Sequence, residues 1–264
     1  MSERIKKIFE TKGKKLVTFT TGGDPNLNTS LEILRTIINN GIDIIEIGMP
    51  FSDPMADGPT IQESSVRSLA NGTKINDIFE LVMNIRKFNN EIPIILMGYY
   101  NSIFNLGIDN FTAKCAEAGV DGLIIVDLQP EEDSELLTKT KERGIDLIRL
   151  ITPTTDQKRL ATILSNASGF LYYVTVTGIT GQNSANIEDL KKSINTIKSS
   201  TKLPIVAGFG IKNRNDVEQI STFTDGVVVG SSIVNIIKDN LNNKNKMIDE
   251  IKVFTKDLKE GIKK

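Results

Sequence analysis

The chain has 264 residues, of which 39% are hydrophobic, and its 32 basic and 33 acidic side chains leave a net charge of −1. A nearly neutral chain without a basic stripe is not expected to bind nucleic acid, and no apolar run reaches the roughly 18–20 residues of a membrane span. Histidine is absent and Cys115 is the only cysteine, which excludes an intrachain disulfide, a histidine metal site and Ser–His or Cys–His pairs.

The N-terminal stretch MSERIKKIFE is charged and has no apolar core, so it predicts an amphipathic helix rather than a signal peptide. Cys115 lies in a helix-like stretch and is expected to be a small core residue. A single cysteine also favours a cytoplasmic location.

Short apolar runs rich in isoleucine and valine recur along the chain, with little polar alternation, as in strands that are buried on both faces. The eight runs are 15–21, 42–48, 92–98, 120–127, 145–152, 170–176, 203–210 and 225–230. Helical patterns cover 28–40, 60–90, 108–118, 131–143, 156–166, 186–200, 213–222, 231–240 and 245–261, with an extra helix at 75–90.

Repeated strand-then-helix units predict an α/β protein, a single domain over 1–264 that forms a (β/α)₈ TIM barrel with extra helices. A doubly wound open sheet is the alternative. The stretch TTGGDP after the first strand does not support that alternative, because it lacks the G-x-G-x-x-G pattern.

Glu46 lies inside the second predicted strand, between Ile45 and Ile47. Side chains alternate along a strand, so Glu46 faces the side opposite to both isoleucines. If that side is the barrel interior near the C-terminal end, desolvation raises the pKa of the carboxyl group and suits it to proton transfer near neutral pH. The alternative is a strand-end glutamate in a surface salt bridge.

Asp53 and Asp57 follow in the loop PFSDPMADGP, which three prolines and a glycine constrain. Asp57 is placed to reach the same pocket as Glu46. Its alternative role is an Asx-turn or the cap of a helix that has Pro59 in its first turn. The residues give no separate chemical argument for Asp53.

Glycine-bearing loops follow the last three predicted strands, as GITGQNS, GFGI and GSSIV. The backbone N–H groups of Gly210, Gly230 and Ser231, with the dipole of a helix that begins near Ser231, predict a phosphate site. The polar stretch 177–186 is interpreted as a mobile lid or as an ordinary surface loop.

Aromatic residues are the candidate walls for a planar ligand, with core packing as the alternative for each one. They are Phe19, Tyr99, Tyr100 and Tyr172.

The stretch IEIGMPFSDPMADGPTIQ closely resembles the signature of the tryptophan synthase alpha chain family. TTGGDP, GYYNSIFNLG, DLQPEE, GITG, GFGI and GSSIV occur in the order of that family, so the resemblance extends along nearly the whole chain. It implies a TIM barrel that cleaves indole-3-glycerol phosphate to indole and glyceraldehyde 3-phosphate in a retro-aldol reaction. It also implies an α₂β₂ complex, in which indole passes to a β subunit that carries pyridoxal phosphate and makes L-tryptophan, with no cofactor in this chain.

The resemblance also assigns roles, motif by motif. Glu46 is the expected acid–base group and Asp57 the expected partner of the indole ring nitrogen, while Asp53 falls in the loop that communicates with the β subunit. The expected substrate-binding residues are Phe19, Tyr99, Tyr172, Thr180, Gly181, Gly210, Gly230 and Ser231. Two departures are Gln129, where the family often has proline, and Val176, where some members have arginine.

Two other functions are compatible with a phosphate-binding barrel. One is a free-standing lyase that releases indole without a β subunit. The other is a barrel without catalytic activity that regulates a partner, and the presence of both Glu46 and Asp57 argues against it.

Overall fold

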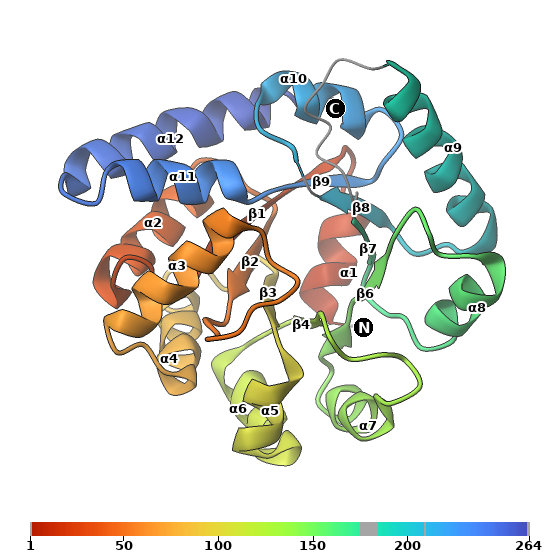
Figure 1. Cartoon of the computed structure of the whole chain (residues 1–264), viewed down its shortest axis with the longest axis horizontal. Coiled ribbons are helices and arrows are strands. Elements are labelled where there is room, and N and C mark those ends of the chain that lie inside the picture. Colours follow the sequence, from red (N-terminus) through yellow and green to blue (C-terminus); the bar gives the residue numbers. More distant parts are fainter. Residues whose placement is uncertain (1, 175–183, 209, 263–264) are drawn as a thin grey trace.

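The computed structural model describes residues 2–174, 184–208 and 210–262, and its strands form one parallel sheet that curls into a ring (Figure 1). The order is β5-β4-β3-β2-β1-β9-β8-β7-β6, and since only Ile148 separates β5 from β6, the two ends of the sheet meet in one segment. The strands are β1 (Lys15–Thr21), β2 (Ile44–Gly48), β3 (Ile94–Gly98), β4 (Gly122–Ile125), β5 (Asp146–Leu147), β6 (Arg149–Ile151), β7 (Leu171–Val174), β8 (Ile205–Gly208) and β9 (Gly226–Val229). The TIM-barrel prediction is confirmed and the doubly wound alternative is wrong.

The fifth predicted strand, 145–152, is divided into two short strands around Ile148. Before this residue the chain pairs with β4, through Leu123 and Leu147, and after it the chain pairs with β7, through Arg149 and Leu171. The chain therefore changes its pairing partner in mid-segment. A continuous apolar pattern cannot report this change, because it reflects burial and not pairing.

The helices form a layer around the barrel (Figure 1), and none in the described part of the chain has the length and apolar character to cross a membrane. They are α1 (Glu3–Glu10), α2 (Leu27–Asn39), α3 (Pro59–Ala70), α4 (Ile75–Arg86), α5 (Tyr100–Leu106), α6 (Ile108–Ala118), α7 (Ser134–Glu142), α8 (Gln157–Ser165), α9 (Ser184–Ser200), α10 (Arg214–Ser221), α11 (Ser231–Asp239) and α12 (Lys244–Glu260). The extra helix before β3 is confirmed as α4. Helix α5 was not expected, because its tyrosine, asparagine and serine residues are weak helix formers.

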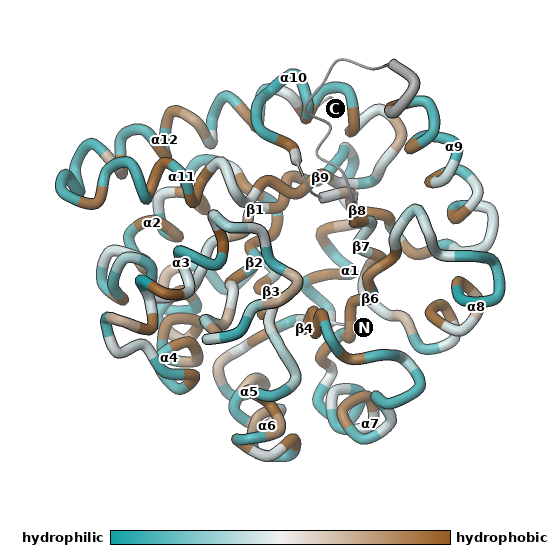
Figure 2. The backbone as a smooth tube through the Cα atoms, viewed as in Figure 1, coloured by the Kyte–Doolittle hydropathy of each residue, from teal (hydrophilic) through white to brown (hydrophobic). Residues whose placement is uncertain are grey.

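The side chains of the barrel strands form two separate apolar layers. Figure 2 shows hydrophobic residues concentrated on the strands and hydrophilic residues on the outer turns of the helices. Ile45 and Ile47 belong to the outer layer, under the helices, while Val17 and Ile44 belong to the interior layer. Cys115 is buried in the outer layer, as predicted.

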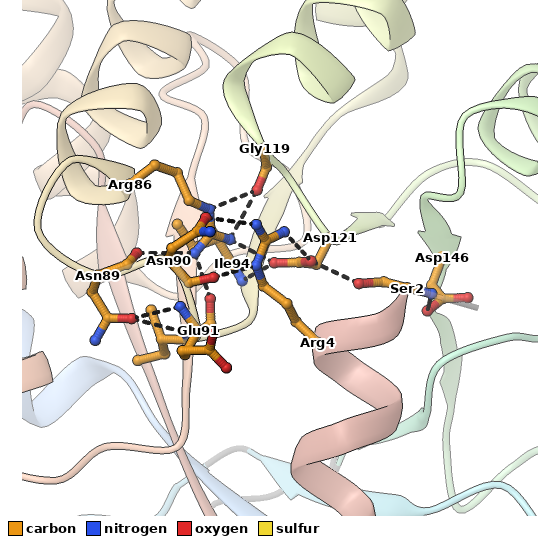
Figure 3. A network of polar contacts seen from close by, with 11 residues as sticks. Ser2, Arg4, Arg86, Asn89, Asn90, Glu91, Ile94, Gly119, Asp121 and Asp146 are labelled. Atoms are coloured by element: carbon orange, nitrogen blue, oxygen red, sulfur yellow. Dashed lines mark hydrogen bonds and ion pairs between the residues drawn. The ribbon is translucent and has the colours of Figure 1, made fainter.

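Helix α1 closes the N-terminal end of the barrel, where its Ile5 joins the interior layer. The buried Asp121, directly before β4, holds this helix in a polar network (Figure 3). Its carboxylate accepts hydrogen bonds from Ser2 Oγ at 2.6 Å, from Arg4 at 3.1 Å and from Arg86 at 2.6 Å. The N-terminal end of the barrel is therefore sealed, and the functional groups lie at the other end. The assignment of 1–264 to one domain remains a prediction.

Candidate active site

Glu46 points into the barrel interior and is completely buried. It pairs in register with Phe19 of β1 and Ile95 of β3, on the same side of β2 as Ile44. Among the described residues, neither carboxyl oxygen has a hydrogen-bond partner, and burial raises the pKa of Glu46 to about 8. The carboxyl group is therefore mainly protonated at neutral pH, as a proton donor requires, and the surface salt bridge considered for it is wrong.

A cavity of about 170 Å³ lies at the C-terminal end of the barrel, where the ends of several strands meet. Asp57 is the acidic residue and Lys212 the basic residue among the described residues that line it. Its walls are Phe19, Asp57, Gly58, Ile61, Met97, Tyr172, Gly210, Ile211, Lys212, Val228, Gly230 and Ser231. A mainly apolar cavity with a few polar groups suits a planar ligand with a charged end.

Glu46 lies directly behind the wall of this cavity. Phe19, its partner in register, and Tyr172 both line the cavity. Burial raises the pKa of Tyr172, and the charges of Glu46 and Asp57 raise it further, which places both carboxyl groups near the same phenol. The structure thus brings the two acidic residues together around Tyr172.

Asp57 lies at the end of the loop after β2 and is partly exposed to the cavity. Burial raises the pKa of its carboxyl group, while the hydrogen bond that Tyr99 donates to Oδ2 at 3.1 Å lowers it. Gly58 and not Asp57 is the N-cap of α3, which begins at Pro59. The cap role considered for Asp57 is therefore wrong, and the position of Pro59 in the first turn is confirmed.

The residues predicted to bind phosphate all line the cavity. Gly210 has a φ of 75°, Gly230 is the N-cap of α11, and Ser231 begins that helix. The hydroxyl of Ser232 donates to the backbone oxygen of Lys212 at 3.3 Å, which joins the two loops. The first N–H groups of a helix have no partner within it, so this corner of the cavity offers donors to an anion.

Two of the expected wall residues do not line the cavity. Tyr99 lies behind Asp57 and Tyr100 begins α5, so only Phe19 and Tyr172 of the four aromatic candidates are wall residues. Asp53 is exposed, and its carboxylate accepts a hydrogen bond from Ser52 Oγ at 2.5 Å. Thr180, Gly181, Val176 and residues 177–183 of the proposed lid fall outside the described residues, while 184–186 begin α9.

Sequence reasoning missed several residues of the cavity. Met97 and Val228 point into the barrel, since they alternate with the outward-facing residues Leu96 and Val227, and this alternation could have found them. Lys212 could have been found because it follows Gly210 by two residues in the same loop. Ile61 carries no such signal, because it comes from the first turn of α3.

Comparison with known proteins gives one consistent family. The family model described as "Tryptophan synthase alpha chain" matches residues 5–263. The tryptophan synthase alpha chain of Petrotoga mobilis is 43% identical over 256 residues, which are 97% of this chain and 98% of that protein. The crystal structure of tryptophan synthase subunit alpha from Legionella pneumophila has a TM-score of 0.91 at 35% identity and covers 99% of this chain and 98% of its own. A chain of Mycobacterium tuberculosis tryptophan synthase, in an aminoacrylate-bound form, has a TM-score of 0.88 at 27% identity and covers 98% of this chain and 99% of its own.

Proposed function

The chain belongs to the tryptophan synthase alpha chain family, and on that premise we propose that Glu46 and Asp57 carry out the retro-aldol cleavage of indole-3-glycerol phosphate. The products are indole and glyceraldehyde 3-phosphate. The observation that carries this proposal is the protonated, fully buried carboxyl group of Glu46 behind a cavity that also exposes Asp57 and two glycine loops.

The C–C bond to the glycerol chain cannot break while the indole ring is aromatic, because the ring cannot accept the bonding electrons. A proton that Glu46 delivers to ring carbon C3 produces a cationic indolenine, whose C=N bond accepts those electrons. Among the described residues no hydrogen bond holds the Glu46 carboxyl group, and the proposal includes a rotation of this side chain toward the cavity. A proton transfer of this kind typically contributes about 10²–10⁴ in rate.

Positive charge develops on the ring nitrogen when C3 is protonated. Asp57 accepts a hydrogen bond from the ring N–H and stabilises that charge. Glu46, now a carboxylate, takes the proton of the C3′ hydroxyl. The hydroxyl carbon becomes the aldehyde, the C–C bond breaks, and its electrons restore the aromatic indole. One proton is thus delivered and one is recovered.

The phosphate group of the substrate binds to the backbone N–H groups at Gly210, Gly230 and Ser231. The helix dipole of α11 favours an anion at its first turn. Phe19 and Tyr172, which line the cavity, contact the indole ring. Thr180 and Gly181 are proposed to complete the site as part of the lid.

The lyase acts with a β subunit, and we propose an α₂β₂ assembly in the cytoplasm in which the β subunit holds pyridoxal phosphate and consumes indole. Structures of a tryptophan synthase are among the structural relatives of this chain. The exposed side chain of Met55, two residues after Asp53, suits a contact with that subunit.

An indole-release assay tests the proposal. The wild-type chain should release indole from indole-3-glycerol phosphate, and a β subunit should raise the rate. Glu46→Gln should abolish release while the fold and the affinity for inorganic phosphate are kept. Release at the wild-type rate by Glu46→Gln would remove the role of Glu46, and a rate that no β subunit changes would favour a free-standing lyase. Phosphate binding without any cleavage by the wild type would favour a regulatory barrel.

A further inference from the structure

Tyr99 is buried directly behind the catalytic loop and outside the cavity wall. It is the N-cap residue of α5, follows β3, and is only 4% exposed. Its ring stacks on Phe51, with centroids 5.1 Å apart and planes at 23°. Phe51 belongs to the same loop as Asp57, so the phenol is fixed against the loop that carries the carboxylate.

The hydroxyl of Tyr99 makes two hydrogen bonds whose directions are determined by chemistry. The backbone N–H of Ala56 donates to Tyr99 Oη at 2.9 Å, and an amide N–H can only donate. The hydroxyl therefore accepts at Ala56, and its single proton goes to Asp57 Oδ2 at 3.1 Å. Both contacts lie in adjacent residues of the loop, so one side chain determines the position of the backbone and of the carboxylate together.

We propose that Tyr99 is a positioning residue for the cleavage reaction, which holds Oδ2 of Asp57 so that Oδ1 faces the ring N–H of the substrate. This inference rests on the proposed function. Among the described residues no donor contacts Oδ1, and Asp57 lines the cavity. One oxygen is thus held by the protein, and the other is left for the substrate.

The same hydrogen bond favours the ionised form of Asp57. Burial raises the pKa of the carboxyl group, and the Tyr99 hydroxyl lowers it. The other groups that face this site are Tyr172, Glu46 behind it and Lys212 across the cavity. The charge of Asp127, which accepts from the backbone N–H of Tyr100 at 2.8 Å, contributes to raising the pKa of Tyr99.

Tyr99→Phe is the direct test, because phenylalanine keeps the ring on Phe51 and removes only the hydroxyl. Loss of a hydrogen bond to a charged group of this kind typically lowers a rate or binding constant about 10-fold to 100-fold. We expect kcat/KM for indole-3-glycerol phosphate to fall by that factor, mostly through kcat, and the acid limb of the pH profile to move to higher pH. The affinity for inorganic phosphate should not change.

Tyr100→Phe is the matched control, since among the described residues its hydroxyl makes no hydrogen bond to the loop, and it should leave kcat and the acid limb unchanged. Wild-type kcat and pH profile in Tyr99→Phe, or loss of phosphate binding together with kcat, would overturn the positioning role and leave the proposed function intact. A wild-type chain that releases no indole would overturn both.

If Tyr99→Phe does not fold, Tyr99 can be replaced by 3-fluorotyrosine, whose hydroxyl is a stronger hydrogen-bond donor. This replacement should move the acid limb of the pH profile to lower pH, and an unmoved limb would overturn the inference.

Discussion

The ring of Phe19 occupies the space in which a side chain on Gly48 would lie. A Cβ atom at Gly48 would be 2.6 Å from Phe19 Cζ and 2.9 Å from Cε2. Gly48 follows Glu46 by two residues on the interior side of β2, and Phe19 lines the cavity. The missing side chain therefore allows an aromatic wall to lie against the strand that carries the proton donor.

Gly48→Ala is expected to displace this ring into the cavity. Gly230 also lies close to this side chain, since a Cβ there would be 3.2 Å from Phe19 Cβ. A ring that intrudes on the substrate position should cost about 1.4 kcal/mol or more of binding free energy, so steady-state kinetics should show KM for indole-3-glycerol phosphate raised by roughly tenfold or more. Phe19→Leu should partly relieve the defect in a double variant. Additive effects of the two substitutions would show that the ring and the new methyl group do not compete for space.

Glu46 should also make the stability of the protein depend on pH. Its pKa is raised from the ordinary 4.5 to about 8 because the charged form loses its hydration in the barrel. The folded state therefore keeps a proton that the unfolded state releases above about pH 4.5. The stabilisation is fully present below that pH and decreases as pH rises toward about 8. At about 1.4 kcal/mol per pKa unit, the full loss is on the order of 5 kcal/mol.

Glu46→Gln removes this titration, because glutamine is neutral at every pH in the range. Urea unfolding at pH 5 and pH 8 should show a smaller decrease in the free energy of unfolding for Glu46→Gln than for the wild type. Asp53→Asn is a suitable control, since Asp53 is exposed and its change should leave the slope unchanged. Equal slopes for Glu46→Gln and the wild type would mean that Glu46 is not protonated in the folded state.

The barrel and its acidic pair could be predicted from the sequence because both are local patterns. Buried strands appear as isoleucine and valine runs, and the position of Glu46 between Ile45 and Ile47 determines which face it takes. The role of Tyr99 could not be predicted in this way. Its contacts with Ala56 and Asp57 join residues that are more than forty positions apart, and only the folded chain brings them together.

Lys212 tests whether the phosphate site uses a side-chain charge as well as backbone donors. It lines the cavity with Gly210 and Ser231, and its neighbour across the joined loops is Ser232. Lys212→Ala should raise KM for indole-3-glycerol phosphate by about tenfold, as expected for loss of one charge-assisted contact, with kcat nearly unchanged. The increase in KM caused by Lys212→Ala should be smaller at high salt, because salt screens the charge of the lysine.

Lys202→Ala is the matched control for Lys212→Ala, because Lys202 is an exposed lysine in the loop before β8, at the opposite end of the strand. It should leave KM and kcat at their wild-type values. If both variants keep the wild-type KM, the backbone N–H groups and the helix dipole hold the phosphate without help from a lysine.

Asp121 should be the residue on which the sealed end of the barrel depends most. Its carboxylate is 2% exposed and accepts from Arg86 at 2.6 Å and from the backbone N–H of Ile94 at 2.9 Å. Asp121→Asn removes the charge and leaves the guanidinium of Arg86 buried without a counter-ion, which typically costs about 3–5 kcal/mol. Urea denaturation should show that loss with an unchanged m-value. Lys7→Ala breaks an ion pair to Glu91 whose two side chains are each 72% exposed, so it should have almost no effect. A similar small effect of both substitutions would show that α1 is held by the burial of its apolar face and not by this network.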